Sequence, residues 1–520
     1  MAFNLLEDRI VRALGPQGVQ AINTLPEVYE RLAADSIVSF PALRPHQRHA
    51  WHALLCQLGA LACPRTGLAT PPSTAAEWLS ALRTLTPAHP DDAPWHLISP
   101  PDRPAFLQAP VPGGRLDGFK TVETPDGLDM LVTAKNHDVK AARAAAPQPG
   151  DWLFALVTLQ TMEGFLGAGN YGVSRMNGGF ANRPGIGLAP PGGIGAHVMR
   201  DIRRLIAIRE ATLDAHDHYD EDGLALLWLE PWDGIAEIPL KHLDPYYIEI
   251  CRRVRLIHEN GRIAARTASS KAARIAFPKE ANGLTGDAWT PVQTGKDGAS
   301  KALTVDARGF AYKRLAEIIL EQGFKPAPLQ IMAADDPDGS WLLICRALAR
   351  GQGKTEGLHE RRIVVPPKLA KKWSREIEAI ALISGQRIEQ SGIVRSALRY
   401  ALMTLFQNGP ERDAFKPRDP GSSKRSEPFL SLFEAEIDRD YFERLFEEAT
   451  AVDARTARIA WLEDLFKRAK AILQTAEAGS PQSAVRRHRA RVRADAALTV
   501  AFRFNKSLAH YFAKETGDAA

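Results

Sequence analysis

Apolar residues recur at helical spacing in several segments of this chain. In 48–63, Trp51, Leu54, Leu58 and Leu61 follow this spacing, so we predict a packed helix there. A second helix is predicted over 151–165. In the last third of the chain the pattern extends over longer segments, and we predict helices at 368–407, which Ser384 and Gly385 could interrupt, and at 428–448, 453–476 and 482–512.

Shorter apolar or alternating runs are typical of strands or buried segments. They lie at 224–229, 273–277 and 341–348, with an extended segment at 105–109, whereas the polar stretch 279–301 is predicted to be a loop. A second polar loop, 409–427, separates two of the long helices. The patterns predict an α+β fold, with a mixed α/β N-terminal domain over 1–365 and an all-α C-terminal four-helix bundle over 366–520.

Composition describes a globular chain that is too long for one core. At 520 residues at least two domains are expected, and 45% hydrophobic and 24% charged residues are ordinary proportions. No stretch approaches the roughly 18 apolar residues of a membrane span, and no secretory signal is expected at the N-terminus. The cysteines are scattered without a CxxC pair, so we expect a cytoplasmic protein without a disulfide framework, zinc site or cofactor.

Charge permits a polyanionic partner without requiring one. The net charge of +5 is small for this length, but five arginines crowd 486–493 with no acidic residue between them. Within the predicted last helix, Arg486, Arg489 and Arg493 share one face. Two interpretations stay open for this face: a solvated surface paired with acidic residues of neighbouring helices, or contact with a phosphate backbone.

The segment 164–179 contains six glycines, which is costly for a chain that must become ordered. Glycine is useful where a backbone turns sharply or approaches a ligand closely. With Asn170, Ser174, Arg175 and Asn177, this loop could reach phosphates or base edges. A purely structural irregular loop is an equally weighted alternative on composition alone.

The run Gly351–Gly357 invites comparison with a phosphate-binding P-loop, but the spacing fails. Leu348 stands where that motif requires its first glycine, so nucleotide hydrolysis is not expected from this segment. A loop that directs Gln352, Lys354 and Thr355 toward a polyanion stays open.

Histidines suggest metal chemistry in two places, and both suggestions are weak. His46, His49 and His52 spread over a wide arc of a helix, and no carboxylate or cysteine accompanies them in the sequence, so a metal site is not expected. Asn136-His137-Asp138 is similar to the His-Asp pair of metal-dependent phosphohydrolases, but no further ligand set is apparent. With Lys135 beside it, this segment is better interpreted as a contact loop than as a catalytic one.

Taken with three further segments, these features resemble the large subunit of the type I-E CRISPR Cascade, the CasA family. The further segments are Phe3-Asn-Leu-Leu6, Phe106-Leu-Gln108 and Glu360-Arg-Arg362. The resemblance implies a non-catalytic subunit that recognises the protospacer-adjacent motif of duplex DNA from the minor groove, promotes strand opening and recruits a helicase–nuclease. The implied partners are crRNA, double-stranded target DNA and the other Cascade subunits (backbone, small and crRNA-end subunits), and no membrane.

The resemblance also implies roles for individual residues. A DNA-reading loop falls on Gly167, Gly169, Asn170 and Gly172, although Asn170 and Tyr171 stand where some relatives have glycine. A first contact loop falls on Lys135, Asn136 and His137, a minor-groove cation on Lys271 or Arg274, and a strand-separating wedge on Gln352, Lys354 and Thr355, while Arg486, Arg489 and Arg493 would bind phosphates. Two alternatives remain: a metal-dependent nuclease that uses Asn136-His137-Asp138, and a purely structural scaffold.

Overall fold

A computed structural model describes residues 2–128, 147–179, 181–216, 218–295, 297–320, 323–351, 354–370, 373–479 and 483–512. The chain forms two compact units. The first comprises Met1–Phe310 and Gln322–Pro367, and the second comprises Ala311–Glu321 and Lys368–Ala520. The division lies close to the predicted one, except that a short segment from the middle of the chain joins the C-terminal unit. Small sheets, many helices and a helical C-terminal region confirm the predicted α+β class.

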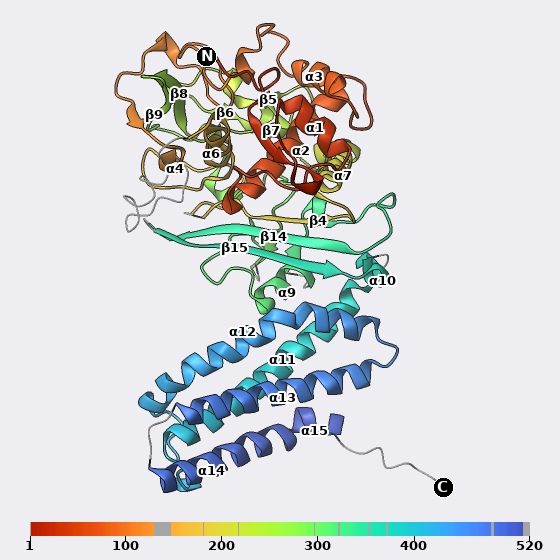
Figure 1. Cartoon of the computed structure of the whole chain (residues 1–520), viewed down its shortest axis with the longest axis vertical. Coiled ribbons are helices and arrows are strands. Elements are labelled where there is room, and N and C mark those ends of the chain that lie inside the picture. Colours follow the sequence, from red (N-terminus) through yellow and green to blue (C-terminus); the bar gives the residue numbers. More distant parts are fainter. Residues whose placement is uncertain are drawn as a thin grey trace. The chain divides into compact units, whose positions relative to one another are not determined.

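Helices form the apolar core of the first unit. They are α1 (Leu25–Ala33), α2 (Arg48–Arg65), α3 (Ala75–Arg83), α6 (Pro149–Met162) and α7 (Ile194–Ala207) (Figure 1). Helix α2 and helix α6 confirm the helices predicted at 48–63 and 151–165. Aromatic rings connect the helices: Trp51 of α2 meets Phe154 of α6 edge-to-face, with ring centroids 5.0 Å apart.

Strands of the first unit form small sheets. The longest is antiparallel, in the order β15 (Lys354–Val365), β14 (Trp341–Gly351) and β4 (Gly185–Ala189). A second sheet orders β3 (Lys120–Val122), β9 (Arg262–Ala268) and β8 (Arg253–Glu259). The strand predicted at 341–348 is confirmed and extends to Gly351.

Two shorter predictions need correction. Only Leu224–Leu226 of the run 224–229 is a strand (β5), because Leu227–Leu229 turns into a 3₁₀ helix. The polar stretch 279–301 is not one loop, since it contains β11 (Val292–Thr294) and the start of β12 (Ser300–Ala302). These strands pair with each other and, through β11, with β13 (Phe324–Lys325), so long-range pairing overrides their polar composition.

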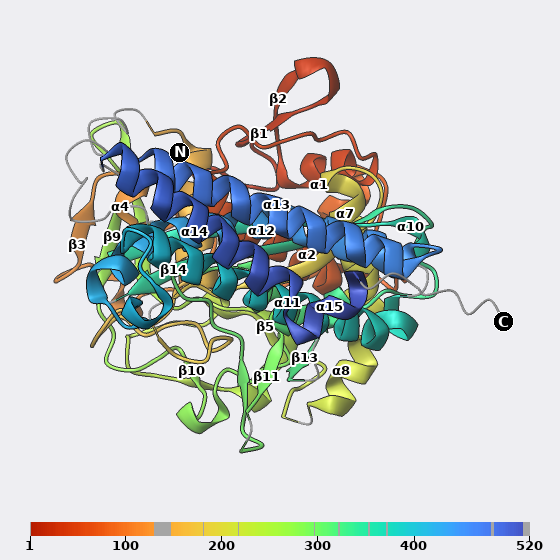
Figure 2. The same cartoon turned by 90° about the horizontal axis from the view of Figure 1, so that it is seen from below.

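The second unit contains the predicted helical bundle. Its long helices are α11 (Trp373–Phe406), α12 (Pro420–Thr450), α13 (Ala454–Ala478) and α14 (Ala484–Arg503), followed by α15 (Lys506–Phe512). Helices α13 and α14 run side by side in Figure 2. The amphipathic patterns after residue 366 therefore predicted the bundle correctly.

The helix boundaries differ from prediction in three places. Helix α11 continues through Ser384 and Gly385, because Ser384 is buried and its hydroxyl lies 2.7 Å from Tyr441 Oη. Helix α12 begins already at Pro420, within the predicted loop, and its first turn is capped by Asp419, which accepts from Ser422 N at 2.7 Å. The last predicted helix is two, α14 and α15, separated at 504–505.

Helix α9 (Tyr312–Leu320) belongs to the second unit although strands of the first unit flank it in sequence. Tyr312 is buried, and its hydroxyl lies 3.0 Å from Glu434 Oε2 and 3.1 Å from Ser391 Oγ. Lys313 forms an ion pair of 2.9 Å with the same glutamate. The bundle is thus completed by a helix that precedes it by many residues.

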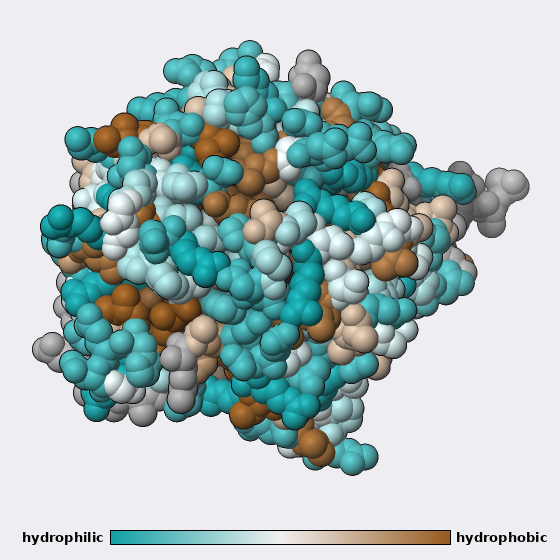
Figure 3. Space-filling model, turned by 90° about the horizontal axis from the view of Figure 1, so that it is seen from above, coloured by the Kyte–Doolittle hydropathy of each residue, from teal (hydrophilic) through white to brown (hydrophobic). Residues whose placement is uncertain are grey.

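None of the described helices combines the length and apolar character needed to cross a membrane. On the face drawn in Figure 3, apolar residues form separate patches within a mostly hydrophilic surface.

Candidate nucleic-acid interface

The glycine-rich run begins where α6 ends and folds back on itself. Phe165 N donates to Gly179 O at 2.9 Å, and Val173 N donates to Glu163 O at 2.8 Å. At Gly172 a Cβ atom would lie 2.6 Å from the carbonyl carbon of Gly164, so the two backbones touch. Gly172 is therefore required by close backbone packing, which a side chain would prevent.

The middle of the loop packs against the segment 269–271. Ser270 N donates to Gly169 O at 3.0 Å, and Tyr171 Oη donates to Lys271 O, also at 3.0 Å. Gly169 has φ +85°, and a Cβ there would lie 2.6 Å from Ser269 Cβ. The fold thus brings together two of the sequence-predicted features, the glycine loop and Lys271.

A buried arginine holds the loop from inside. Arg252 Nη2 donates to Gly164 O at 2.9 Å, and Nη1 donates to the Tyr171 carbonyl. The backbone of Arg252 is itself fixed, because its N–H donates to Gln160 Oε1 of α6 at 2.8 Å. One helix, α6, therefore positions both the start of the loop and the arginine that closes it.

A β-hairpin reaches the same end of α6. Strands β14 and β15 pair up to Gly351 opposite Lys354 and Arg350 opposite Thr355. Arg350 Nη1 lies 3.4 Å from Glu163 Oε2, directly before the glycine loop. The proposed wedge thus lies where β14 ends and β15 begins, with Lys354 and Thr355 opening β15, while Gln352 lies outside the described residues.

The two candidates for the minor-groove cation occupy different environments. Lys271 is exposed. Arg274 is buried; its guanidinium donates to Glu230 O at 2.9 Å and lies 5.4 Å from the centre of the Trp232 ring. Burial lowers the pKa of Arg274 to about 10. Arg274 therefore belongs to the core, and of the two candidates only Lys271 presents its charge to a ligand.

Two polar residues of the loop also point inward rather than toward a ligand. Arg175 is buried, and its guanidinium lies 3.9 Å from the centre of the Tyr247 ring. Ser174 N donates to Glu249 Oε2 at 2.9 Å. Burial raises the pKa of Glu249, although the nearby charge of Arg175 opposes this. Asn170, in contrast, is exposed.

The arginines of helix α14 in the second unit also differ in exposure: some face solvent and one contacts the protein. Arg486 and Arg489 are exposed on α14 and form no ion pair with any residue of the described ranges. Arg493 is half-buried; it donates to Gly409 O at 2.8 Å and pairs with Glu411. Arg493 therefore ties α14 to the loop before α12, which leaves Arg486 and Arg489 as the candidates for phosphate contact.

Lys135, Asn136, His137 and Asp138 lie outside the described residues. The first contact loop and the nuclease alternative built on it consequently stay predictions.

Of the three repeated histidines, His52 differs from the expectation because other ligand-type side chains lie beside it. His52 Nε2 lies 2.8 Å from Asp201 Oδ2 and 3.6 Å from Cys56 Sγ, and His197 lies beside them. The expectation that no carboxylate or cysteine accompanies these histidines is wrong, because the fold places α7 against α2. Two pairs of ligand-type residues four positions apart, 52/56 and 197/201, were the signal in the sequence.

Neither a protein-family model nor a curated protein sequence matches this chain. Solved structures match it along almost its whole length. CRISPR-associated protein Cse1 from Acidimicrobium ferrooxidans has 15% identity and a TM-score of 0.63, with 97% of this chain and 99% of that one covered. CasA (Cse1) of Thermus thermophilus has 14% identity and a TM-score of 0.63, with 97% and 100% covered.

Cse1 of Thermobifida fusca gives the same result, with 14% identity, a TM-score of 0.63 and coverage of 97% of this chain and 99% of the other. At these identities the likeness speaks for the fold. Over nearly its whole length, the chain has the fold of the Cse1 (CasA) proteins, as the resemblance of its sequence led us to expect.

Proposed function

We propose that this chain belongs to the CasA family and serves as the non-catalytic large subunit of a type I-E Cascade, an RNA-guided complex that surveys DNA. The observation that carries the proposal is the convergence of three segments at the end of α6. Arg252, Arg350 and Glu163 join the glycine loop to the end of the β14–β15 pair, and Tyr171 joins the loop to Lys271. The resemblance of the sequence predicts the same three segments as the site.

The loop presents few but accessible polar groups to a partner. Asn170 exposes its amide side chain beside the half-buried Gly167 and Gly169, and the exposed Lys271 follows the segment that packs on Gly169. Such groups fit the minor groove, where hydrogen-bond patterns are degenerate and a narrow groove attracts cations. Recognition of the protospacer-adjacent motif by this loop should therefore tolerate several related motifs.

The end of the β14–β15 pair is suited to separating the strands of a duplex. The two strands stay paired up to Gly351 opposite Lys354, so this end is stiffer than a free loop. In this proposal this end inserts beside the first target base pair, and the guide RNA then pairs with the released strand. Exposed Arg486 and Arg489 of α14 would hold phosphates of single-stranded DNA.

The proposal includes the partners implied by this role. They are crRNA, duplex target DNA, the backbone, small and crRNA-end subunits of Cascade, and a helicase–nuclease that is recruited after strand opening. The chain itself would cleave nothing. A cytoplasmic setting follows from the role.

The decisive experiment uses the assembled complex with a defined guide. Duplexes that carry the matching target and a randomised flanking motif are offered, and the bound fraction is sequenced. We expect enrichment of a few related motifs, and loss of that enrichment when Lys271→Ala is combined with Gly169→Asp. Uniform recovery of all motifs by the intact complex would refute motif recognition, and failure of the variants to co-purify with crRNA would favour the scaffold alternative.

The nuclease alternative has a direct test. The purified chain is incubated with single- and double-stranded DNA in the presence of Mg²⁺ or Mn²⁺, beside a variant carrying His137→Ala and Asp138→Ala. We expect no cleavage from either protein. Cleavage by the wild type that the double substitution abolishes would establish the enzyme instead.

A further inference from the structure

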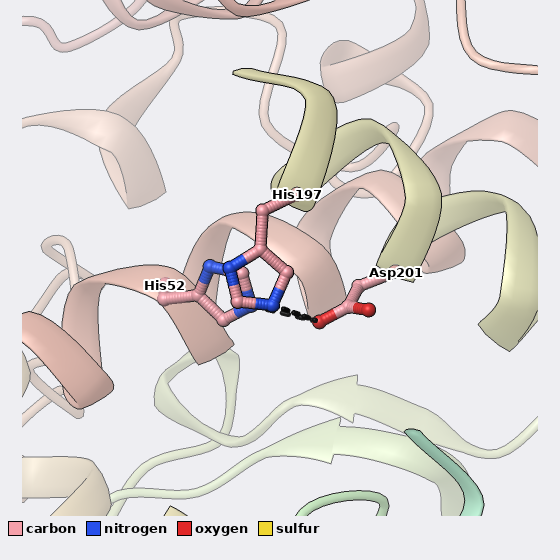
Figure 4. Close-up of side chains that lie close together, drawn as sticks. All are labelled: His52, His197 and Asp201. Atoms are coloured by element: carbon pink, nitrogen blue, oxygen red, sulfur yellow. Dashed lines mark hydrogen bonds and ion pairs between the residues drawn. The ribbon is translucent and has the colours of Figure 1, made fainter. Parts of the chain in front are cut away.

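Three side chains of metal-ligand type, His52, His197 and Asp201, meet in the first unit on two helices that lie far apart in the sequence, and a fourth, Cys56, lies beside His52. Helix α2 contributes His52 and Cys56, one turn apart, and helix α7 contributes His197 and Asp201, also one turn apart. Figure 4 shows the two imidazole rings facing each other and the carboxylate. Each helix thus directs two donors toward the other.

The ligand atoms of His52, His197 and Asp201 all lie within 4.8 Å of one another, which is compact enough for one small coordination sphere. His52 Nε2 lies 2.8 Å from Asp201 Oδ2 and 3.6 Å from Cys56 Sγ, and His197 Nε2 lies 3.3 Å from the same carboxylate oxygen. In a tetrahedral zinc site with bond lengths of about 2.0–2.3 Å, neighbouring donors are roughly 3.3–3.7 Å apart. Only the 2.8 Å separation is shorter, and it is a hydrogen-bond length.

Hydrogen bonding alone does not account for this cluster. His197 is 8% exposed, and its Nε2 lies 3.3 Å from Asp201 Oδ2 without meeting the geometry of a hydrogen bond. An unsatisfied buried nitrogen is costly, and native structures contain few. The imidazole centroids are 4.1 Å apart, so two ring nitrogens compete for one carboxylate oxygen.

The surroundings orient the donors as around a metal. Arg200 Nη1 lies 3.1 Å from Asp201 Oδ1, which fixes the carboxylate and leaves Oδ2 for the histidines.

We propose that His52, Cys56, His197 and Asp201 bind one Zn²⁺ ion, which clamps α2 to α7. A thiolate, a carboxylate and two neutral imidazoles suit zinc better than magnesium or calcium, which prefer oxygen ligands. The thiolate and the carboxylate balance the charge of the ion. Zinc binds the thiolate form of cysteine, so the Cys56 thiol loses its proton when the ion binds.

With Cys56 as the fourth donor, four protein ligands would surround the ion and leave no open position. The role of the site is therefore structural, and it is independent of DNA recognition. The glycine loop follows α6, which contacts α2, so the clamp supports the scaffold of the candidate interface without belonging to it.

The test begins with the full-length chain, purified without a chelating tag and equilibrated with Zn²⁺ before gel filtration. Elemental analysis should give about one zinc per chain. Asp201→Asn and His197→Gln, which preserve size, should each lose it. His49→Gln is the matched control, because His49 is equally buried on the same helix but packs against Gly185.

Substitution with Co²⁺ gives a second readout. The wild type should show the absorption of tetrahedral cobalt together with a thiolate-to-cobalt charge-transfer band, and Cys56→Ser should lose that band. Chelation should lower the melting temperature of the wild type and leave that of His197→Gln unchanged. Zinc-free wild type after equilibration, or equal zinc in wild type and Asp201→Asn with both proteins folded by circular dichroism, would overturn the proposal.

Discussion

Tyr171 and Lys271, a hundred residues apart in the chain, are joined by a hydrogen bond in which Tyr171 Oη donates to Lys271 O at 3.0 Å. The acceptor is the main chain, so the side chain of Lys271 is not involved in the bond. The position of the glycine loop and the charge beside it can consequently be altered separately.

Lys271→Ala should remove one phosphate or groove contact and leave the loop in place. We expect weaker duplex binding at all motifs, with the slope of log affinity against log salt reduced in magnitude by about 1. Fluorescence anisotropy over a salt series measures this. Tyr171→Phe is the complement: it keeps the charge and loosens the loop, so it should reduce the preference among motifs while the salt slope stays as in the wild type.

Arg274→Ala should behave differently from Lys271→Ala. It removes a buried guanidinium that contacts Trp232 and leaves the carbonyl of Glu230 without this donor. Stability should fall by about 1–3 kcal/mol, measured by urea unfolding, because a buried hydrogen bond to a charged group is lost. If the unfolding midpoint is unchanged and the slope of log affinity against log salt is reduced, Arg274 contacts DNA rather than stabilising the core.

Gly169→Asp should abolish target binding while the complex still assembles. The positive φ costs a non-glycine residue about 1–3 kcal/mol, and the new side chain collides with Ser269. A loss of about 1.4 kcal/mol already weakens binding tenfold. Gly178→Asp is the matched control, since it has a φ of +61°, adds the same charge to the same loop and meets nothing within 4 Å. Equal loss in both variants would indicate a charge effect rather than loop geometry.

The arginines of α14 offer a contrast within one helix. Arg486→Ala with Arg489→Ala should lower the magnitude of the salt slope by about 2, because both guanidinium groups are exposed. Arg493→Ala should leave the slope unchanged and instead lower the melting temperature, since Arg493 holds Gly409 and Glu411. The opposite pattern would assign phosphate binding to Arg493.

The buried ion pair between Arg183 and Asp287 makes the stability of the folded chain depend on pH in the acid range. Burial alone would raise the pKa of Asp287, but Arg183 lowers it to about 2 from its usual 3.8. The pair therefore stabilises the folded chain fully above about pH 4, and this contribution, roughly 2 kcal/mol, is lost as pH falls toward 2. Asp287→Asn should reduce stability at neutral pH and flatten the acid side of the unfolding profile. The exposed Asp117→Asn should follow the wild type.

Prediction from sequence succeeded where a periodic pattern is long. Helices α11–α13 each bury an apolar face, and α2 is buried on all sides from His49 to Cys63, so their long apolar patterns identified them. Prediction failed at 279–301, where polar strands form because β11 pairs with β13. It also failed at Ser384, where the helix continues because the hydroxyl contacts buried Tyr441 on another helix. Lys271 and Arg274, three residues apart, lie just before the short strand β10 (Ile275–Ala276). Arg274 contacts the ring of Trp232 whereas Lys271 is exposed, a difference that composition does not reveal.

The cluster around His52 was also not predicted from the sequence, because its members come together only in the fold. A ligand set is visible in sequence only when its members lie close together, and His52 and Asp201 are separated by 149 positions. Each helix supplies half of the donors.

Helix α9 has a consequence for how this protein can be divided and exchanged. Because Tyr312 packs on Ser391 and Glu434, a fragment that starts at Lys368 would expose the apolar surface that α9 covers. The C-terminal unit is thus encoded by two separate stretches of the gene. Recombination between relatives that replaces only the second stretch would pair a foreign bundle with a resident α9, so functional chimaeras should carry both stretches from one parent.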